Sequence, residues 1–434
     1  MIRLFVFSFF VFLLSVSNAA GQEFSSYFED RTLRVDYTFS GDTARQDIYV
    51  DELCSMPHWY GKRHRLAEVP LKGNGQIIVR DRESQQVIYR HSFSTLFQEW
   101  LATDEAKHTR KSFENVFMVP YPKQPVDITV ELYDYHDRIN ATMKHTVDPN
   151  DILIRHIGEE NVTPYVTLHP SSPLLQQGGA GGGSPIHIAF VAEGYQGSEL
   201  QTYLDDCRKA VKALFEHEPF RSLQDRFNII ALLSTSRDSG VSVPREGIWK
   251  NTILGSHFDT FYTDRYLTTL HLKRLHDVLA GTPYEHIIIL TNTTTYGGGG
   301  IYNSYNLASA HGPKYEPVVV HEFGHSFGGL GDEYPYGDND PMYFSDTEPW
   351  EPNLTTQHDF RGKWENLIQE GKVGLVEGGG YLSHGVWRGQ EDCRMRTNEF
   401  PVFCPVCQQA LTRLIKFYTE LLVSAKTFFK LYKN

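Results

Sequence analysis

Cysteine is scarce in this sequence, and long internal apolar runs are missing. The chain has five cysteines among 434 residues, and it is long enough to bury a hydrophobic core without disulfides. No internal stretch reaches the roughly 18 apolar residues of a membrane-spanning helix, so we expect no membrane span in the mature chain. Hydrophobic residues make up 40% of the chain, which excludes a mainly disordered or collagen-like protein.

Positive charge is also in short supply. Lysine and arginine number 41 against 53 aspartates and glutamates, which gives a formal net charge of −12. A surface with this excess of carboxylates repels phosphate groups. We therefore expect no nucleic-acid partner.

The N-terminus has the pattern of a secretory signal peptide over residues 1–19. Arg3 precedes an almost entirely apolar run at 4–16, and Ser17-Asn18-Ala19 supplies the small residues of a cleavage site. An uncleaved membrane anchor is the alternative. We expect a mature chain that begins near Ala20 and is secreted, periplasmic or attached to the cell surface.

Residues 20–165 predict an antiparallel β-sandwich, which would form an N-terminal accessory domain. Apolar and polar residues alternate over 33–39 and again over 126–132, and glycine and asparagine turns separate such runs. One helical interruption is expected near 95–103. No group of residues in this region suggests catalysis.

A glycine-rich segment at 166–185 predicts a linker, and the pattern then changes to alternating strands and helices. Buried-type strands are expected near 186–191, 227–233 and 286–291, which predicts an α/β (α+β) domain over 186–434 with a mainly parallel sheet. Four glycines at 297–300 enter a further strand, which indicates that another backbone comes close there.

The segment that indicates chemistry begins at Pro317, a residue suited to the first turn of a helix. His321 and His325 lie four residues apart on one helix face, where both imidazoles can reach one zinc ion. Glu322 is placed to hydrogen-bond a water molecule at the metal and to act as general base and acid. A solvated helix with a chance histidine pair is disfavoured by the apolar run at 318–320.

A catalytic zinc ion needs a third protein ligand and one open position. The pattern HExxHxxGxxH would place this ligand at Gly331, which has no ligand atom. If Gly329 is the turn glycine instead, Asp332 follows it at the required offset of three residues. We therefore expect Asp332 as the third ligand, with Glu333 as the alternative.

Three cysteines cluster near the C-terminus. Cys404 and Cys407 form a CxxC pair, but a zinc ribbon would need a second such pair or two histidines nearby. The predicted export favours a disulfide from Cys393 to Cys404 or Cys407 instead. Met395 has the setting of the methionine turn beneath the zinc in metzincins, although an ordinary loop methionine is the alternative.

The motif HEFGHSFGGLGDEY at 321–334, with CRM at 393–395 and FCPVC at 403–407, resembles the IgA-peptidase family of secreted zinc metallopeptidases. The stretches 192–195 and 239–241 also resemble that family. The resemblance implies a metzincin-like catalytic fold and zinc-dependent endopeptidase activity. It does not fix the substrate, so whether this protein cuts immunoglobulin A stays open.

These observations predict a secreted zinc endopeptidase that acts on protein or peptide substrates. We expect His321, His325 and Asp332 to hold one Zn²⁺ per chain, with Glu322 as the catalytic acid–base group. The alternatives are a surface binding or adhesion protein built on a metallopeptidase-like scaffold, and a zinc amidase acting on cell-wall or small peptides.

Two further features of the sequence concern substrate binding. The edge at 297–303 is expected to bind substrate as an added β-strand. Tyr302, Tyr334 and Arg388 are unranked candidates for stabilising the tetrahedral intermediate.

Overall fold

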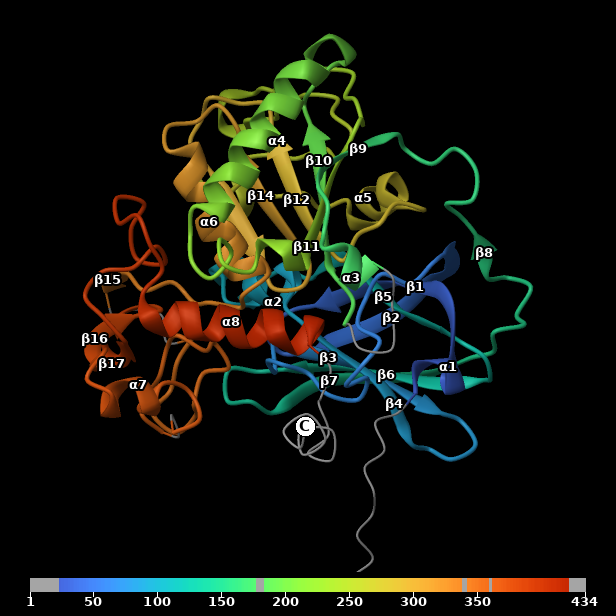
Figure 1. Ribbon diagram of the computed structural model, residues 1–434, viewed down its shortest axis with the longest axis horizontal. Helices are drawn as coiled ribbons and strands as arrows, with labels where there is room; N and C mark the ends of the chain where they lie inside the picture. The colour runs from blue at the N-terminus through green and yellow to red at the C-terminus, as the bar shows by residue number, and fades with distance from the viewer. Residues whose placement is uncertain (1–22, 177–182, 338–341, 359–360, 421–434) are drawn as a thin grey trace, which may run out of the picture.

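A computed structural model describes residues 23–176, 183–337, 342–358 and 361–420 as a mixed α/β protein (Figure 1). The predicted signal peptide and the centre of the glycine-rich run lie outside the described residues. The part of the chain that is described contains four sheets. None of its helices is both long and apolar enough to cross a bilayer.

The N-terminal part contains two four-stranded sheets, with strand orders β5-β1-β2-β8 and β4-β3-β6-β7. Neighbouring strands are antiparallel except for β2 and β8. The strands are β1 (Phe28–Gly41), β2 (Gln46–Pro57), β3 (Gly75–Asp81), β4 (Val87–Phe93), β5 (Lys111–Pro122), β6 (Val126–Tyr133), β7 (Ile139–Val147) and β8 (Arg155–His156).

Aromatic side chains join these two sheets in one core. The rings of Phe93 in β4 and Phe117 in β5 lie 4.3 Å apart between centroids, and Phe39 of β1 packs against both. The apolar residues of β1, Leu33, Val35, Tyr37 and Phe39, are all fully buried as predicted, and the polar Arg34 and Asp36 between them are buried as well. The expected helical interruption is also present, as α2 (Leu96–Leu101) and η1 (Asp104–Lys107).

The C-terminal part is built on a six-stranded sheet of order β13-β14-β12-β10-β11-β9. Its inner pairs are parallel, as predicted, and both edge strands are antiparallel. Residues 166–169, expected in the linker, instead belong to β9 and pair with β11. The strands are β9 (Tyr165–His169), β10 (Ile186–Glu193), β11 (Phe227–Leu232), β12 (His286–Thr291), β13 (Gly298–Ile301) and β14 (Tyr305–Ser309).

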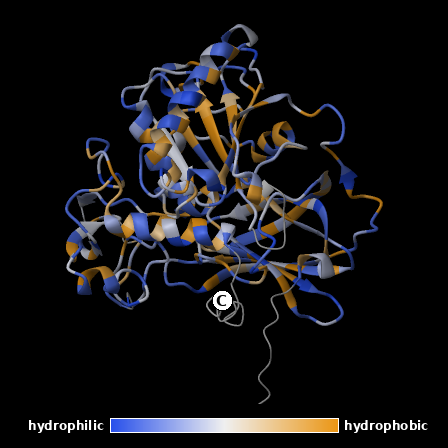
Figure 2. Ribbon diagram, in the orientation of Figure 1, coloured by the Kyte–Doolittle hydropathy of each residue, from blue (hydrophilic) through white to orange (hydrophobic). Residues whose placement is uncertain are grey.

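Helices cover both faces of this sheet, whose central strands are strongly hydrophobic (Figures 1 and 2). Residues Ile188 and Phe190 of β10 face a core shared with α4, α6 and α8, whereas Ala189 and Val191 face α5 and the N-terminal sheets. The helices are α4 (Leu200–Phe215), α5 (Leu272–Leu279), α6 (Tyr315–Ser326) and α8 (Pro405–Thr419).

Shorter elements complete the described chain. A three-stranded sheet of order β15-β17-β16 lies beside α7 (Figure 1). The remaining elements are α1 (Phe24–Tyr27), α3 (Pro173–Gln176), α7 (Glu365–Gln369), η2 (Gly197–Glu199), η3 (Gln224–Arg226), η4 (Pro244–Glu246), η5 (Thr260–Tyr262), β15 (Pro335–Gly337), β16 (Val376–Gly379) and β17 (Tyr381–Arg388).

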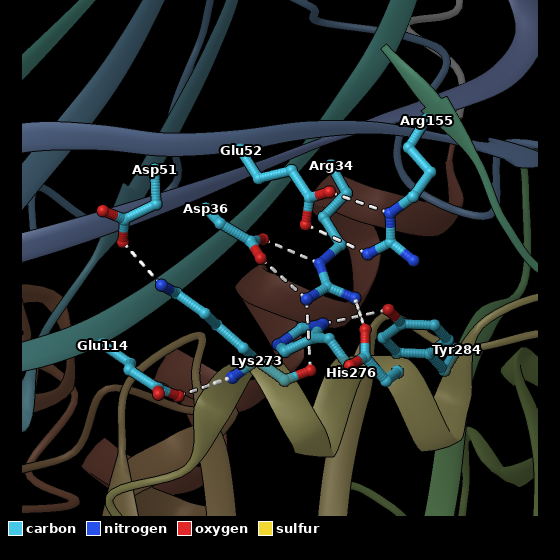
Figure 3. A network of polar contacts seen from close by, with 10 residues as sticks. Arg34, Asp36, Asp51, Glu52, Glu114, Arg155, Lys273, His276 and Tyr284 are labelled. Carbon is cyan, nitrogen blue, oxygen red and sulfur yellow. Dashed lines mark hydrogen bonds and ion pairs between the residues drawn. The ribbon is translucent and has the colours of Figure 1, made fainter. Parts of the chain in front are cut away.

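A network of charged residues fixes the N-terminal sheet against α5 (Figure 3). Arg34 of β1 is 1% exposed and donates to the carboxylates of Asp36 and Asp277 at 2.7 and 2.6 Å. Lys273 of α5 pairs with Asp51 of β2 at 2.7 Å. The buried guanidinium of Arg34 also donates to the carbonyl oxygen of Lys273 at 3.1 Å, so these contacts help to orient α5 against the N-terminal sheet.

Candidate metal centre and active-site cleft

The HExxH motif lies in α6, with Pro317 in its first turn as predicted. The run 318–320 is buried against the sheet, which turns the opposite helix face toward a cleft. His321 and His325 share that face, and their Nε2 atoms lie 3.0 Å apart. The spacing of four residues therefore brings the two imidazoles together, as the sequence indicates.

The chain reverses just after α6, at Gly329. This residue has φ +58°, a left-handed conformation that glycine adopts at little steric cost. Its amide donates to the carbonyl oxygen of His325 at 2.9 Å. The reversal brings Asp332 back to the histidines, with Oδ1 3.1 Å from His321 Nε2 and 3.2 Å from His325 Nε2.

The Nδ1 atoms of the two histidines point away from Asp332 and are hydrogen-bonded to backbone carbonyl oxygens. His321 Nδ1 lies 2.9 Å from the carbonyl oxygen of Arg394, and His325 Nδ1 lies 2.6 Å from that of Leu330. Because a carbonyl oxygen only accepts, each Nδ1 carries a proton, so in the neutral imidazoles each Nε2 presents a lone pair.

Three acceptor atoms therefore converge on one point, an arrangement that a cation stabilises. Asp332 Oδ1 is buried and has no hydrogen-bond partner among the described residues. Zinc bonds of about 2.0–2.1 Å place tetrahedral ligand atoms about 3.3 Å apart, close to the separations observed here. The donor set of two imidazoles and one carboxylate fits zinc.

Glu333, the alternative third ligand, points away from the histidines. Its Oε1 accepts from Asn353 Nδ2 at 2.9 Å and lies 3.2 Å from Cys407 Sγ. Successive side chains of an extended segment point in opposite directions, so only one of the two adjacent carboxylates reaches the histidines. The structure brings Asp332, and not Glu333, to the histidine pair.

Met395 lies directly beneath the histidine helix. It is fully buried, and a Cβ atom added to Gly324, which separates the two histidines, would lie only 2.6 Å from its sulfur. The same loop supplies the Arg394 carbonyl for His321 and accepts from the amide of Glu333 at 2.9 Å. The loop of Met395 thus contacts both the His321 segment and the segment that carries Asp332 and Glu333.

The glycines of β13 pack against α6 at Glu322. A Cβ atom on Gly298 would lie 2.9 Å from Glu322 Oε1, and one on Gly300 would clash with the carbonyl oxygen of Glu322. The close backbone approach predicted from 297–300 is therefore confirmed. Only glycine permits this contact, which places the edge strand next to Glu322.

Replacing Gly300 with alanine is expected to lower the free energy of unfolding by about 1–3 kcal/mol, because the new methyl group must displace α6. Any catalytic activity should fall with it, since Glu322 moves too. Gly197→Ala is the matched control, because nothing lies within 4 Å of its added Cβ. Thermal unfolding of both variants tests this, and equal stability would contradict the packing described here.

The candidate ligands His321, His325 and Asp332, here called the metal-ligand group, lie in a cleft of about 590 Å³. One wall of this cleft comes from the N-terminal part. Gln98 and Glu99 of α2 line this wall. Burial raises the pKa of Glu99 to about 7, and its carboxylate accepts from the hydroxyl of Tyr266. The sequence of the N-terminal region gives no sign of this contribution, because only folding brings the short helix α2 to the cleft.

A tyrosine missed in the sequence contacts the metal-ligand group. Tyr381 donates from its hydroxyl to Asp332 Oδ2, and its backbone is left-handed at φ +68°. A non-glycine residue in this conformation is strained, and such strain concentrates at functional sites. The glycines at 378–380 are the only local sequence signal of an unusual turn.

The structure distinguishes the three residues suggested for stabilising the tetrahedral intermediate. Tyr302 and Tyr334 both line the cleft. Arg388 lies elsewhere, where its guanidinium donates to the carbonyl oxygens of Glu377 and Gly378. Arg388 is therefore removed as a candidate for contact with substrate.

The predicted added-strand mode of substrate binding is not available at Gly298. An isolated β-bridge already pairs Tyr266 with Gly298 there. The loop that carries Tyr266 covers this part of the edge, a long-range packing that the glycine pattern alone does not reveal.

The predicted disulfide is absent, because all five cysteines are free thiols in the structure. The expected proximity is nevertheless present, with 3.7 Å between Cys393 Sγ and Cys407 Sγ. These sulfur atoms form one buried group with the carboxylate of Glu333, a proximity that only the fold reveals.

Comparison with known families yields two matches. A model described as IgA Peptidase M64 matches residues 175–373, the segment that contains the HExxH motif and Asp332. A second model, described as Peptidase M64 N-terminus, matches residues 23–144. A search of curated proteins finds no match.

Proposed function

Because the chain belongs to the M64 family of IgA peptidases, which are metallopeptidases, we propose that it is a secreted zinc-dependent endopeptidase. The convergence of His321, His325 and Asp332 beside Glu322, at the floor of a cleft, supports this function. The exported location rests on the signal-peptide pattern at 1–19. We further propose a metzincin-like catalytic domain preceded by a β-sandwich.

In this proposal the two histidines and Asp332 hold the zinc ion through Nε2 and Oδ1. When bound, zinc would lower the pKa of a water molecule to about 7 and would polarise a carbonyl group. Glu322 accepts a proton from the water and later donates it to the leaving amine. Its enclosed position in the cleft raises the pKa of Glu322, which makes the carboxylate a stronger base.

The proposed substrate is a protein segment held between the N-terminal wall and the metal-ligand group. The cleft volume of about 590 Å³ lies within the range of specific ligand sites. A cleft formed by both parts of the chain favours recognition on both sides of the scissile bond. Glu99 supplies an acidic group on the wall, and Tyr334 lies beside the ligands.

The direct test incubates the mature chain, from residue 20, with a peptide library and with unfolded proteins. We expect cleavage within chains, loss of cleavage after chelation, and recovery on addition of zinc. Cleavage confined to cell-wall peptides would indicate the amidase alternative. Zinc binding without hydrolysis of any of these substrates would contradict the proposal and indicate a binding protein.

Tyr381→Phe is expected to weaken zinc binding about 10–100-fold, because the hydroxyl that orients Asp332 is lost. Tyr336→Phe is the matched control, since its ring stacks on Tyr381 at 5.9 Å but its side chain is 79% exposed. Titration with a competing chelator measures both affinities. Wild-type affinity in Tyr381→Phe would show that the hydrogen bond does not support the metal site.

A further inference from the structure

A second group of ligand-type side chains lies behind the histidine site. Glu333, Cys393, Cys404 and Cys407 offer one carboxylate oxygen and three sulfur atoms, all within 4.8 Å of one another. All four side chains are at most 1% exposed. They come from three separate segments: the extended segment between α6 and β15, the loop of Met395 and the start of α8.

The carboxylate in this group lacks the partners that its burial requires. Glu333 Oε1 accepts from Asn353 and lies 3.2 and 4.0 Å from the sulfur atoms of Cys407 and Cys404. Glu333 Oε2 is buried and has no hydrogen-bond partner among the described residues. Thiols are weak donors, so hydrogen bonds alone leave this carboxylate poorly compensated.

We propose that Glu333, Cys393, Cys404 and Cys407 bind a second metal ion, and that this ion is zinc. Four ligand atoms that surround one point match a closed structural zinc site, and thiolate-rich tetrahedral sets select zinc. The lack of solvent exposure leaves no open position for a substrate. The ion therefore has a structural role.

Such an ion would stabilise the segments that position Asp332 and His321. Glu333 is adjacent to Asp332, and its amide is hydrogen-bonded to the carbonyl of Met395 at 2.9 Å. Cys393 begins the loop whose Arg394 carbonyl orients His321. One metal ion would therefore join the third-ligand segment and the methionine loop to α8.

A disulfide is the competing state of the same cysteines. Cys393 Sγ and Cys407 Sγ are 3.7 Å apart, well beyond the bond length of about 2.05 Å. Closing that bond would leave Glu333 with fewer ligand partners than a metal ion provides.

The test isolates the second ion by removing the histidine site. The full mature chain carrying His321→Ala and His325→Ala is purified, and its metal content and zinc X-ray absorption are measured. We expect about one zinc ion per chain with sulfur neighbours near 2.3 Å, against about two in the wild type. Cys404→Ser with Cys407→Ser should lose this sulfur signal, and the control Cys207→Ser, a buried cysteine in α4, should keep it.

Alkylation of the wild-type chain provides a second measurement if the cysteine variants do not fold. In denaturant, chelation should make three more thiols reactive, which peptide mapping would assign to Cys393, Cys404 and Cys407. A disulfide among these residues, or a histidine variant that retains no zinc, would overturn the proposal. Neither result depends on proteolysis, so this test is independent of the proposed function.

Discussion

Glu322→Gln is expected to lower the turnover of a protein substrate by about 10²–10⁴-fold while the zinc content stays unchanged. The substitution keeps the size of the side chain but removes the group that accepts the proton. Glu322 is not one of the three converging ligand atoms, so metal binding should not depend on its charge. Steady-state kinetics and elemental analysis of the same preparation check both parts.

Glu316→Gln is the matched control for this experiment. Glu316 is an exposed acid in the first turn of the same helix, and it does not line the cleft. Its replacement should leave turnover within about twofold of wild type, because exposed substitutions rarely perturb a fold. Near-wild-type turnover in Glu322→Gln would show that another group accepts the proton.

Asp332→Ala should empty the histidine site, because it removes one of the three proposed protein ligands. The loss of affinity should exceed the roughly 10–100-fold effect of losing a supporting group. Any zinc that remains should have mainly sulfur neighbours, from the cysteine group. X-ray absorption and a chelator titration on the same sample measure these two properties.

Glu333→Ala is the informative comparison, since the two carboxylates are adjacent in the chain. It should keep zinc at the histidines, with nitrogen and oxygen neighbours and without the sulfur signal. The reverse pattern, with the histidine site emptied by Glu333→Ala and filled in Asp332→Ala, would show that the assignment of the third ligand is wrong.

The sequence predicts the local geometry of the site well, because short-range rules determine it. The spacing of His321 and His325 places both on one helix face. The chain reverses at Gly329, and Asp332, three residues later, therefore lies beside the two histidines. Each of these features depends on residues close together in the chain, where helix periodicity and glycine conformation are decisive.

Residues that reach the site through distant segments escaped prediction. Glu99 lies in a short helix of the N-terminal part, and Tyr381 follows a glycine turn in a small sheet. The cysteine group escaped for the same reason. A CxxC pair without a second pair or two histidines gave no zinc pattern, and only folding places Glu333 beside Cys404 and Cys407.

Anomalous diffraction at the zinc absorption edge, from crystals of the mature chain, tests the central claim most directly. The account predicts a strong peak bonded to His321 Nε2, His325 Nε2 and Asp332 Oδ1, at about 2.0–2.2 Å from each. A map from zinc-loaded crystals with no peak between these three atoms would contradict the assignment of a zinc peptidase centre.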